Sequence, residues 1–294
     1  MIEKNNYYKF SNSDFFTIAG KDRYSFLQGL VSNDLKKLEN EDIIYSSLLS
    51  PQGKFLFDFF VSNYGETYLI ECNKKFTEEL LKKLSLYKLR SEIEINVERK
   101  LKSYTINSIN YELLSSFKKN EKFKISLDPR FKNYFLKIYT TPVYFEEIVK
   151  TLDLLNCSKS DFEDIRIKNV IPDFSIEANL GKSLLLELRF DELNGIDWNK
   201  GCYMGQELTA RTKYRGKIKK KLFGVKLNGK VDSDEIVYEK KIVGSLQNHF
   251  GEYGIAIVDE KIVENCLRNS LCLTIGKIKV IPFIPKWSNS IIPN

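Results

Sequence analysis

The period of the hydrophobic pattern switches repeatedly between two and about 3.6 over the part of the chain before residue 216. Alternation with period two is typical of half-buried strands, and a period near 3.6 is typical of amphipathic helices. The pattern predicts strands at 14–18, 43–49, 55–62, 67–71, 93–97, 123–127 and 134–139. It predicts helices at 22–30, 74–88 and 141–155 and a short one near 160. A region that mixes both periods in this order is expected to fold as one α+β unit.

Turn and cap residues mark where several of these elements begin. The segment Pro51-Gln52-Gly53 lies between two apolar runs and predicts a hairpin. Asp22 is placed to act as the N-terminal cap of the first helix. Thr141 followed by Pro142 reads as a cap and a first-turn proline, which opens another helix. These local signals support the boundaries that the period suggests.

After Gly216 the pattern changes to short alternating stretches separated by Gly, Asn and Asp. They lie at 223–227, 237–238, 242–246, 253–258, 271–275 and 277–284, and little between them is expected to be helical. Six short strands with frequent turns predict a small antiparallel barrel or sandwich. We therefore expect two domains, an α+β domain at 1–216 and a β-barrel at 217–294.

The composition is that of an ordinary soluble globular protein. The 294 residues are 43% hydrophobic and 29% charged, and the length allows two domains. The apolar runs are shorter than a membrane span, so no membrane association is expected. The net charge of +7 permits an anionic ligand or RNA without requiring one. Part of this charge is the basic run at 213–221, K-Y-R-G-K-I-K-K-K, which could equally be a solvated edge strand.

The cysteine pattern argues against metal and disulfide frameworks. Five cysteines are scattered without a C-x-x-C pair, and His249 is the single histidine of the sequence. Such spacing predicts neither a zinc site nor a self-contained cluster site, so no metal ligands are assigned. Reduced thiols are typical of the cytosol. The segment M-I-E-K-N-N-Y-Y-K-F lacks the apolar core of a secretory peptide, so a cytoplasmic location is expected.

Candidate chemistry concentrates in residues 200–216, K-G-C-Y-M-G-Q-E-L-T-A-R-T-K-Y-R-G. Gly201 and Gly205 allow a tight loop that presents Cys202 and Tyr203. The residues from Gln206 onward are good helix formers, so the loop is expected to precede a helix N-terminus. A helix N-terminus and nearby cations favour a thiolate. Cys202 is therefore the candidate reactive thiol, although a small buried cysteine in a turn is the alternative.

The charged residues around Cys202 are expected to have different roles. Glu207 lies four residues before Arg211, so an ion pair on one helix face is expected. An exposed pair of this kind contributes only about 0.3 to 0.5 kcal/mol, and stability alone is a poor reason for it. We expect Glu207 to orient Arg211. Lys200 and Arg215 would then be free to keep the thiol ionised and to receive an anionic partner.

The motif K-G-C-Y-x-G-Q-E followed by A-R-x-x-x-R-G resembles the signature of the YgfZ/Iba57 family. That family is related to the T-protein, the aminomethyltransferase of glycine cleavage. Further stretches match in the same order along the chain: D-R at 22–23, F-L-Q-G-L-V-S-N-D at 26–34, L-L-S-P-Q-G-K-F at 48–55 and Y-K-L-R-S-E-I at 87–93. The resemblance is weak between about 100 and 159.

The resemblance implies a T-protein-like folate-binding domain followed by a C-terminal barrel, and a reduced folate such as tetrahydrofolate as cofactor. It implies an accessory protein that supports iron-sulfur cluster assembly or repair, and thereby cluster-dependent tRNA modification, through Cys202. A folate-dependent aminomethyltransferase is the alternative. T-proteins lack a cysteine at this position, which favours the accessory role. A direct RNA-binding module has only the basic run in its favour.

The resemblance also implies site residues and partners. The residues expected around the folate or the thiol are Gln28, Asn33, Asp34, Arg90, Lys200, Tyr203, Gln206, Glu207, Arg211 and Arg215. The partners expected are iron-sulfur cluster assembly or client proteins, with a transient cluster contact and a weak or indirect tRNA contact. A monomer is expected.

Overall fold

The computed structural model describes residue 3, residues 5–114, residue 117, and residues 122–131, 134–216 and 218–289. Contacts divide the chain into two compact units. The first unit comprises Met1–Pro51, Leu56–Lys159 and Leu193–Gln206, and the second comprises Gln52–Phe55, Ser160–Glu192 and Glu207–Asn294. This division does not follow the boundary expected near Gly216, because residues 160–192 group with the C-terminal strands. The assignment of functional domains to 1–216 and 217–294 stays a prediction.

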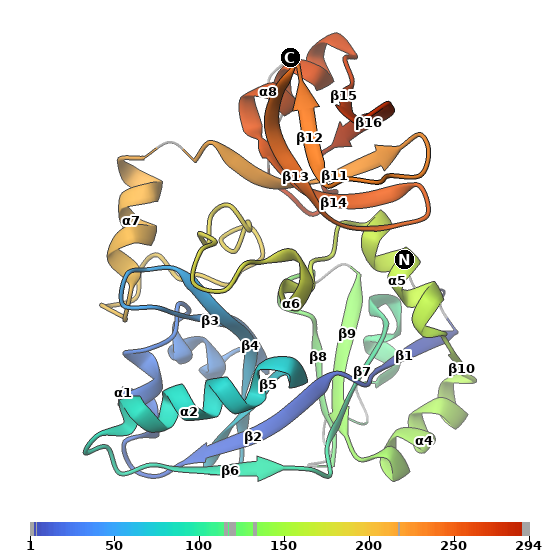
Figure 1. The fold of residues 1–294 in the computed structure, drawn as a ribbon. Helices are drawn as coiled ribbons and strands as arrows, with labels where there is room; N and C mark the ends of the chain where they lie inside the picture. The colour runs from blue at the N-terminus through green and yellow to red at the C-terminus, as the bar shows by residue number, and fades with distance from the viewer. Residues whose placement is uncertain are drawn as a thin grey trace. The chain divides into compact units, whose positions relative to one another are not determined.

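One five-stranded antiparallel sheet of the first unit has the order β3-β4-β5-β2-β6 (Figure 1). Its strands are β2 (Ser13–Ala19), β3 (Ile43–Leu49), β4 (Phe55–Tyr64), β5 (Thr67–Asn73) and β6 (Glu94–Glu98). Strand β2 pairs with both β5 and β6 although these are far apart in sequence. All five strands match the predicted ranges within about two residues, as expected for element boundaries.

The second sheet of the first unit is mixed and has the order β10-β1-β7-β9-β8. Its strands are β1 (Asn6–Phe10), β7 (Lys102–Asn107), β8 (Lys124–Leu127), β9 (Phe135–Thr140) and β10 (Leu155–Asn156). The β1–β10 pair is parallel, and the other pairs are antiparallel. Strands β8 and β9 were predicted, whereas the pattern missed β1, β7 and β10; the helix predicted at 141–155 ends at Leu152, and Leu155 belongs to β10.

The helices of the first unit cover its sheets and carry the connections. They are α1 (Arg23–Gln28), α2 (Thr77–Lys88) and α4 (Pro142–Leu152), together with the 3-10 turns η1 (Leu35–Glu39), η2 (Lys74–Phe76), η3 (Ser108–Asn110) and η4 (Glu112–Leu114). Helix α4 begins at the predicted proline and buries Phe145 and Ile148 against the mixed sheet. The predicted Asp22 cap is wrong, because its carboxylate accepts the backbone N–H of Glu92 instead.

A buried ion pair ties the two sheets of the first unit together. Lys137 Nζ of β9 lies 2.9 Å from Glu71 Oε2 of β5, and both side chains are almost fully buried. The hydroxyls of Tyr139 and Ser13 donate to the same carboxylate, each at 2.7 Å. Burial would raise the pKa of Glu71, but the charge of Lys137 and the hydrogen bonds from Lys137 and Tyr139 lower it below the ordinary value. The carboxylate is therefore held charged between the sheets.

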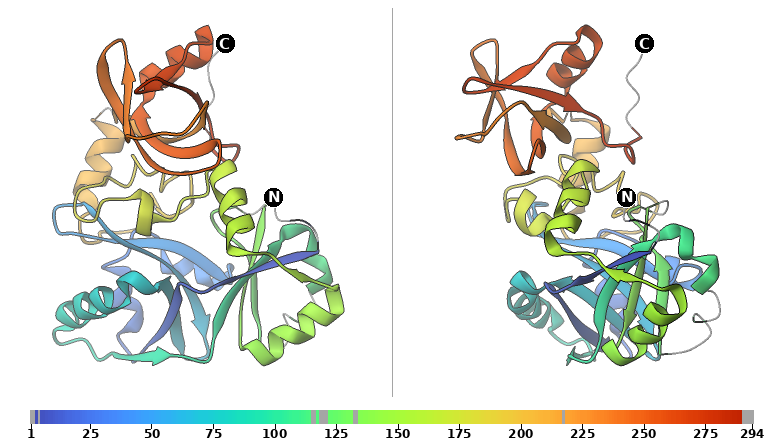
Figure 2. Two further views of the ribbon diagram at one scale, coloured as in Figure 1. Left: turned by 45° about the vertical axis from the view of Figure 1, so that its right-hand side comes forward. Right: turned by 90° about the vertical axis from the view of Figure 1, so that its right-hand side faces the viewer.

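The second unit contains a closed antiparallel barrel with the order β11-β14-β13-β12-β15-β16, which Figure 2 shows from two further sides. Its strands are β11 (Lys220–Leu227), β12 (Glu235–Tyr238), β13 (Lys241–Phe250), β14 (Tyr253–Asp259), β15 (Leu273–Ile275) and β16 (Ile278–Phe283). Each corresponds to one of the predicted stretches. Pairing of β11 with β16 closes the barrel, so no strand edge stays open there.

The expectation of little helix after Gly216 is wrong at α8 (Glu260–Asn269). The carboxylate of Asp259 caps this helix by accepting the N–H groups of Lys261 and Ile262. Helix α8 buries Val263 and Cys266 and packs against β14 and β16. The other helices that follow α4 are α5 (Lys159–Lys168), α6 (Phe174–Glu177) and α7 (Gln206–Tyr214).

These elements confirm the predicted fold class, an α+β region of mixed sheets and helices followed by a small antiparallel barrel. Within the described ranges, none of the helices has the length and apolar character needed to cross a bilayer.

Candidate functional site

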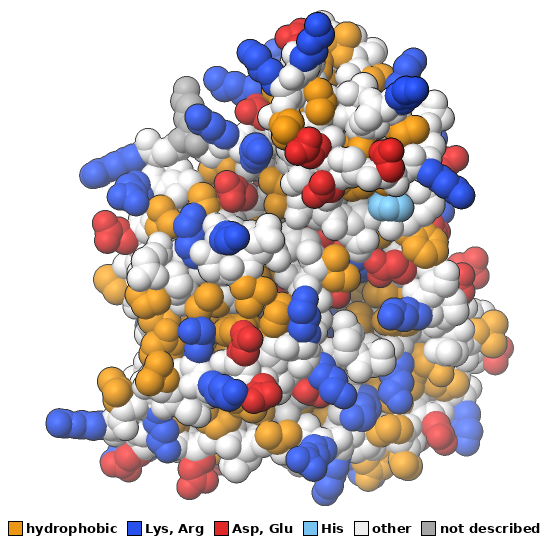
Figure 3. Space-filling view, in the orientation of Figure 1, with side chains coloured by type: hydrophobic (Ala, Val, Ile, Leu, Met, Phe, Trp, Pro, Cys, Tyr) orange, Lys and Arg blue, Asp and Glu red, His pale blue; other side chains and the backbone are white. Residues whose placement is uncertain are grey.

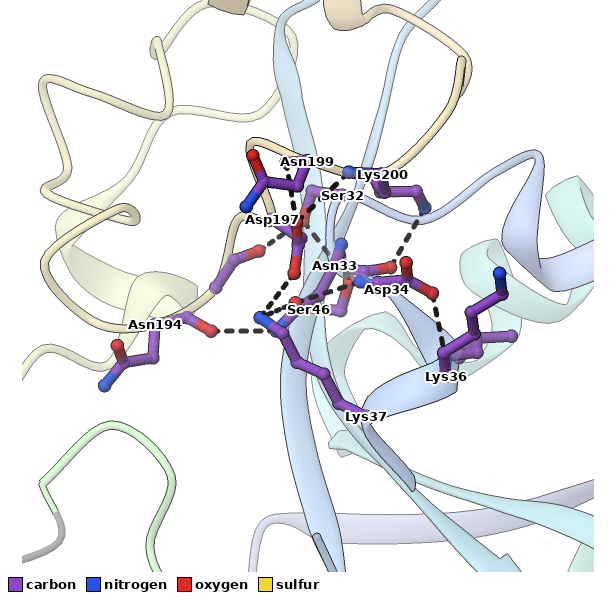
Figure 4. Close-up of polar contacts among 12 residues, drawn as sticks. Ser32, Asn33, Asp34, Lys36, Lys37, Ser46, Asn194, Asp197, Asn199 and Lys200 are labelled. Atoms are coloured by element: carbon purple, nitrogen blue, oxygen red, sulfur yellow. Dashed lines mark hydrogen bonds and ion pairs between the residues drawn. The ribbon is translucent and has the colours of Figure 1, made fainter. Parts of the chain in front are cut away.

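The candidate site is the loop Asp197–Gly205, here called the Cys202 loop, which lies in the first unit. It contacts the segment Gln28–Asp34, here called the α1 end segment, which contains the last residue of α1 and the polar residues after it (Figure 4). Cys202 is exposed at this loop. Gln28, Asn33 and Lys200, which the resemblance implies around the folate or the thiol, are in direct contact, and their role in a site stays a prediction.

Lys200 is the main contact between the loop and the α1 end segment. Its Nζ donates to the backbone carbonyl oxygens of Gln28 at 2.9 Å, Val31 at 2.6 Å and Asn33 at 2.9 Å. All three protons of the ammonium group are used in this way. Burial lowers the pKa of Lys200 to about 8. The role expected of Lys200, a free cation beside the thiol, is therefore not the role that this geometry gives it.

The residues after Cys202 hold the other side of the loop. Met204 donates its N–H to the carbonyl of Gly29 at 2.9 Å. The Tyr203 ring is buried, and Lys200 Nζ lies 5.0 Å from its centroid. Gly205 has a φ of +78°, which a glycine adopts without strain and which turns the chain into α7. Cys202 is thus presented between two anchored flanks.

Gln206, one of the expected site residues, closes the turn before α7. Its Oε1 accepts the N–H of Tyr203 at 3.3 Å, and its own N–H donates to the Tyr203 carbonyl at 3.2 Å. The helix begins at Gln206, as predicted. The amide side chain therefore shapes the loop that carries the thiol.

Asp197 organises the start of the loop, and the sequence analysis missed it. Its Oδ1 accepts the N–H groups of Asn199 at 2.7 Å and Lys200 at 3.1 Å, and its Oδ2 lies 2.8 Å from Lys37 Nζ. Burial would raise the pKa of Asp197, but the hydrogen bonds from Lys37 and from backbone N–H groups lower it. The signal available in the sequence was its place just before the motif, in I-D-W-N-K-G-C.

Asn33 is a structural hub in this arrangement. Its Nδ2 donates to the carbonyls of Tyr45 at 2.7 Å and Asn194 at 2.8 Å, and its Oδ1 accepts from Lys37 Nζ at 2.8 Å. The N–H of Asp34 also donates to Oδ1, at 2.9 Å. The side chain is buried and all of its hydrogen-bonding groups are used. It does not fit the expected role of a contact to a pterin ring.

Gln28 and Asp34 contact each other. Gln28 Nε2 donates to Asp34 Oδ1 at 2.8 Å, and Gln28 Oε1 accepts the N–H of Leu35 at 3.0 Å. Asp34 Oδ1 also accepts the N–H of Lys36, which caps η1. These bonds order the α1 end segment. The contacts to Asp34 engage its Oδ1, so Oδ2 is the oxygen that can face a ligand.

The structure does not bring Arg90 to this group. Arg90 is exposed in the turn that follows α2. Two residues later, Glu92 bonds to Asp22 at the N-terminal end of α1. The Cys202 loop contacts the opposite end of the same helix. No contact between Arg90 and the loop is present among the described residues.

Glu207, Arg211 and Arg215 are exposed residues of α7 and the turn after it. The predicted ion pair between Glu207 and Arg211 is not formed within the described part of α7, which agrees with the small gain from an exposed pair. Lys217 of the basic run lies outside the described residues. On the face seen in Figure 3, Lys and Arg side chains are scattered among acidic and apolar ones.

A second polar cluster of the first unit was also missed. Arg130 is buried and bonds to Asp128 with its Nε at 3.1 Å and its Nη2 at 2.9 Å. The guanidinium lies 4.8 Å from the Phe60 ring centroid and 5.2 Å from that of Tyr45. The Tyr45 hydroxyl donates to Asp58 at 2.8 Å. The sequence signal was an acidic residue inside the apolar run F-L-F-D-F-F-V.

In the part of the chain that the structure describes, no group of three or more His, Cys, Asp or Glu side chains is arranged to hold a metal ion.

The fold places the chain in a known structural class. It is similar to the crystal structure of the glycine cleavage system aminomethyltransferase T from Bartonella henselae, with a TM-score of 0.73 over 95% of this chain and 84% of that one. The sequence identity is 10%, so this likeness shows the T-protein fold alone.

Sequence relatives narrow the class. The chain is 30% identical over 264 residues to the IBA57 homologue of Dictyostelium discoideum, covering 77% of this chain and 64% of that protein. It is 27% identical over 296 residues to mouse IBA57, covering 92% and 82%, and 26% identical over 242 residues to the tRNA-modifying protein YgfZ of Vibrio vulnificus, covering 75% and 69%. A scan against models of protein families finds no match. The chain is therefore similar in sequence to IBA57 and YgfZ proteins, which agrees with the resemblance of its motif.

The chain spans between about half and two thirds of the length of several of these relatives: 64% of the Dictyostelium protein and 52% of the Neurospora crassa protein. The IBA57 relatives are named as mitochondrial assembly factors of iron-sulfur clusters. The prediction of a cytoplasmic location is therefore wrong, since these relatives point to mitochondria. Scattered reduced cysteines suit any reducing compartment and cannot separate the two locations.

Proposed function

We propose that this chain supports iron-sulfur cluster assembly or repair, and thereby cluster-dependent tRNA modification, with Cys202 as the functional thiol. The observation that carries the proposal is the exposed Cys202 on a loop whose two flanks are hydrogen-bonded to the α1 end segment. The names of the IBA57 and YgfZ relatives support the same role.

The chemistry of the site favours a transient contact. A thiolate is both a ligand for iron and a nucleophile. Iron-sulfur clusters are held by about four protein ligands, and Cys202 supplies one. Under this proposal, the assembly or client protein that docks here supplies the other ligands, and the cluster is cargo that passes between proteins. Any effect on tRNA then runs through the enzymes that receive the cluster.

Replacing Cys202 with Ser in the full chain tests this role. We expect cells that carry only Cys202→Ser to lose most of the activity of cluster-dependent enzymes, including those that thiolate tRNA, because serine removes the soft sulfur ligand and nucleophile. Cys272→Ser is the matched control, since Cys272 is the other exposed thiol of the described residues. Normal cluster-dependent activity in the Cys202→Ser cells, with the protein present at its usual level, would overturn the proposal.

We further propose that the α+β domain expected at 1–216 binds a reduced folate such as tetrahydrofolate. The sequence similarity to YgfZ and the T-protein fold support this proposal. A pterin needs a few polar groups in an otherwise apolar site, and a glutamyl tail needs cations. The amide groups of Gln28 and Asn33 do not fit as contacts, because internal bonds use them. Asp34 Oδ2 and the exposed Arg90 are the candidates that keep the capacity to bind.

Equilibrium titration with tetrahydrofolate tests the folate proposal. We expect saturable binding that weakens several-fold in Arg90→Ala, because this variant removes a cation from the tail. Lys88→Ala is a neighbouring control at the same helix end. Absence of binding at millimolar folate would exclude the proposal. The alternative function, a folate-dependent aminomethyltransferase, predicts chemical conversion of the folate that persists in Cys202→Ser.

A further inference from the structure

We propose that the backbone carbonyls of Gln28, Val31 and Asn33 form a cation-binding cradle, that the ammonium group of Lys200 occupies it, and that this contact positions the Cys202 loop. Lys200 is then a positioning residue, which acts on Cys202 through the backbone. Only the link to activity rests on the function proposed above.

The cradle follows from the way α1 ends. The last carbonyl groups of a helix have no partner inside the helix and carry its partial negative charge. Gln28 is the last residue of α1, and the chain then turns so that the carbonyls of Val31 and Asn33 face the same point. Three oxygens at 2.6 to 2.9 Å from one nitrogen make a close fit for an ammonium ion.

The charges that face Lys200 come from both sides of the contact. Asp34 belongs to the α1 end segment and Asp197 to the loop, and both stabilise the ammonium form. The charge of Lys37 disfavours the ammonium form of Lys200, although Lys37 itself forms an ion pair with Asp197 at 2.8 Å. The cradle is thus a partly buried site in which the carbonyl oxygens and the nearby carboxylates stabilise one positive charge. Without a cation, the three carbonyl oxygens lose hydrogen bonds that water replaces poorly there.

The cradle controls the loop because of where Lys200 lies in the sequence. Lys200 is two residues before Cys202, and Met204 is two residues after it. Met204 donates its N–H to Gly29, which lies between two residues of the cradle. The same segment therefore holds both flanks of the thiol. Removing the ammonium group releases one flank and should weaken the hydrogen bond of the other.

Hydrogen exchange at the Met204 amide is the direct test, since that amide reports closure of the loop and does not depend on activity. In Lys200→Ala we expect the Met204 amide to exchange at least about tenfold faster than in the wild type, as expected for local opening. The Ile138 amide in β9 serves as an internal reference and should stay unchanged.

Chemical rescue separates the cradle from simple packing. Lys200→Ala leaves space for a small cation, so ammonium chloride should restore most of the Met204 protection. Tetramethylammonium chloride at the same concentration has no N–H donors and should not restore it. Lys200→Met keeps the aliphatic stem beside Tyr203 and should lose protection without rescue. It serves as the second folded variant if the alanine variant does not fold.

Unchanged exchange of Met204 in both variants would overturn the inference, as would equal rescue by the two salts. The activity of cluster-dependent enzymes is measured in parallel. If Lys200→Ala loses protection at Met204 and ammonium restores it, the cradle is upheld. If the Cys202→Ser variant is fully active in the same assays, the proposed function is rejected. The two ideas therefore fail separately.

Discussion

At the scale of single residues, the five cysteines differ mainly in burial. Cys72, Cys157 and Cys266 are buried, whereas Cys202 and Cys272 are exposed. Burial raises the pKa of Cys72 to about 12, so its reactive thiolate form is scarce near neutral pH. The sequence singled out Cys202 as the candidate reactive thiol because its neighbours differ from those of the others, and this role stays a prediction.

We predict that alkylation of the native protein at pH 8 labels two thiols, Cys202 and Cys272, and that unfolding exposes all five. The reason is access, since a buried thiol reacts only after local opening. Mass spectrometry of peptides after brief labelling checks this. In Cys272→Ser the native protein should take up one label. Early labelling of Cys72 or Cys266 would show that the buried positions open more readily than their packing indicates.

At the scale of elements, the period of the pattern predicted most strands but missed some for physical reasons. Strand β7 buries Ser103 and Thr105, so polar residues occupy positions that the pattern assigns to solvent. Strand β1 has the sequence N-Y-Y-K-F, in which tyrosines carry polar ends. Helix α8 was missed although its signal lies in the sequence, because Ile262, Val263, Cys266 and Leu267 recur at helical spacing after the cap Asp259.

At the candidate site, local sequence predicted the elements but not the contacts between residues far apart in the chain. The motif identified the loop, its glycine turn and the start of α7 from local sequence. The partners of Lys200 lie 167 to 172 positions away along the chain. Local spacing holds no information about such a contact, so the lysine was expected to stand free. The same holds for Asn33, whose amide is used by Tyr45 and Asn194.

At the scale of the whole molecule, both compact units combine an apolar core with buried charges. The barrel of the second unit closes on an apolar core that includes Phe223, Val258 and Ile275, and the same unit buries Arg166 against Glu177 at 2.8 Å. The first unit places charges between its two sheets, with Lys137 and Glu71 at 2.9 Å and Arg130 beside Asp128. Replacing one partner of a buried pair leaves the other charge uncompensated, which is far more costly than losing an exposed pair.

We predict that Glu71→Gln lowers the free energy of unfolding of the first unit by about 3 to 5 kcal/mol at neutral pH, because Lys137 then stays buried without its counter-charge. The double variant Glu71→Gln with Lys137→Met should regain much of this loss. Glu78→Gln removes one side of an exposed pair with Lys82 and serves as the control, with little change expected. The measurement is hydrogen exchange of β5 and β9 amides, since two units need not unfold together.

The same carboxylate sets a dependence on pH. The pKa of Glu71 in the folded protein lies below its ordinary value of 4.5. The contribution of Glu71 to the free energy of unfolding is therefore fully present above pH 4.5. It is lost as the pH falls through the lowered folded pKa, because the unfolded chain then binds more protons. Exchange protection of β5 and β9 should therefore fall below about pH 4.5 in the wild type. The fall should be smaller in the double variant, and an equal fall in both would show that other carboxylates of the unit carry the acid sensitivity.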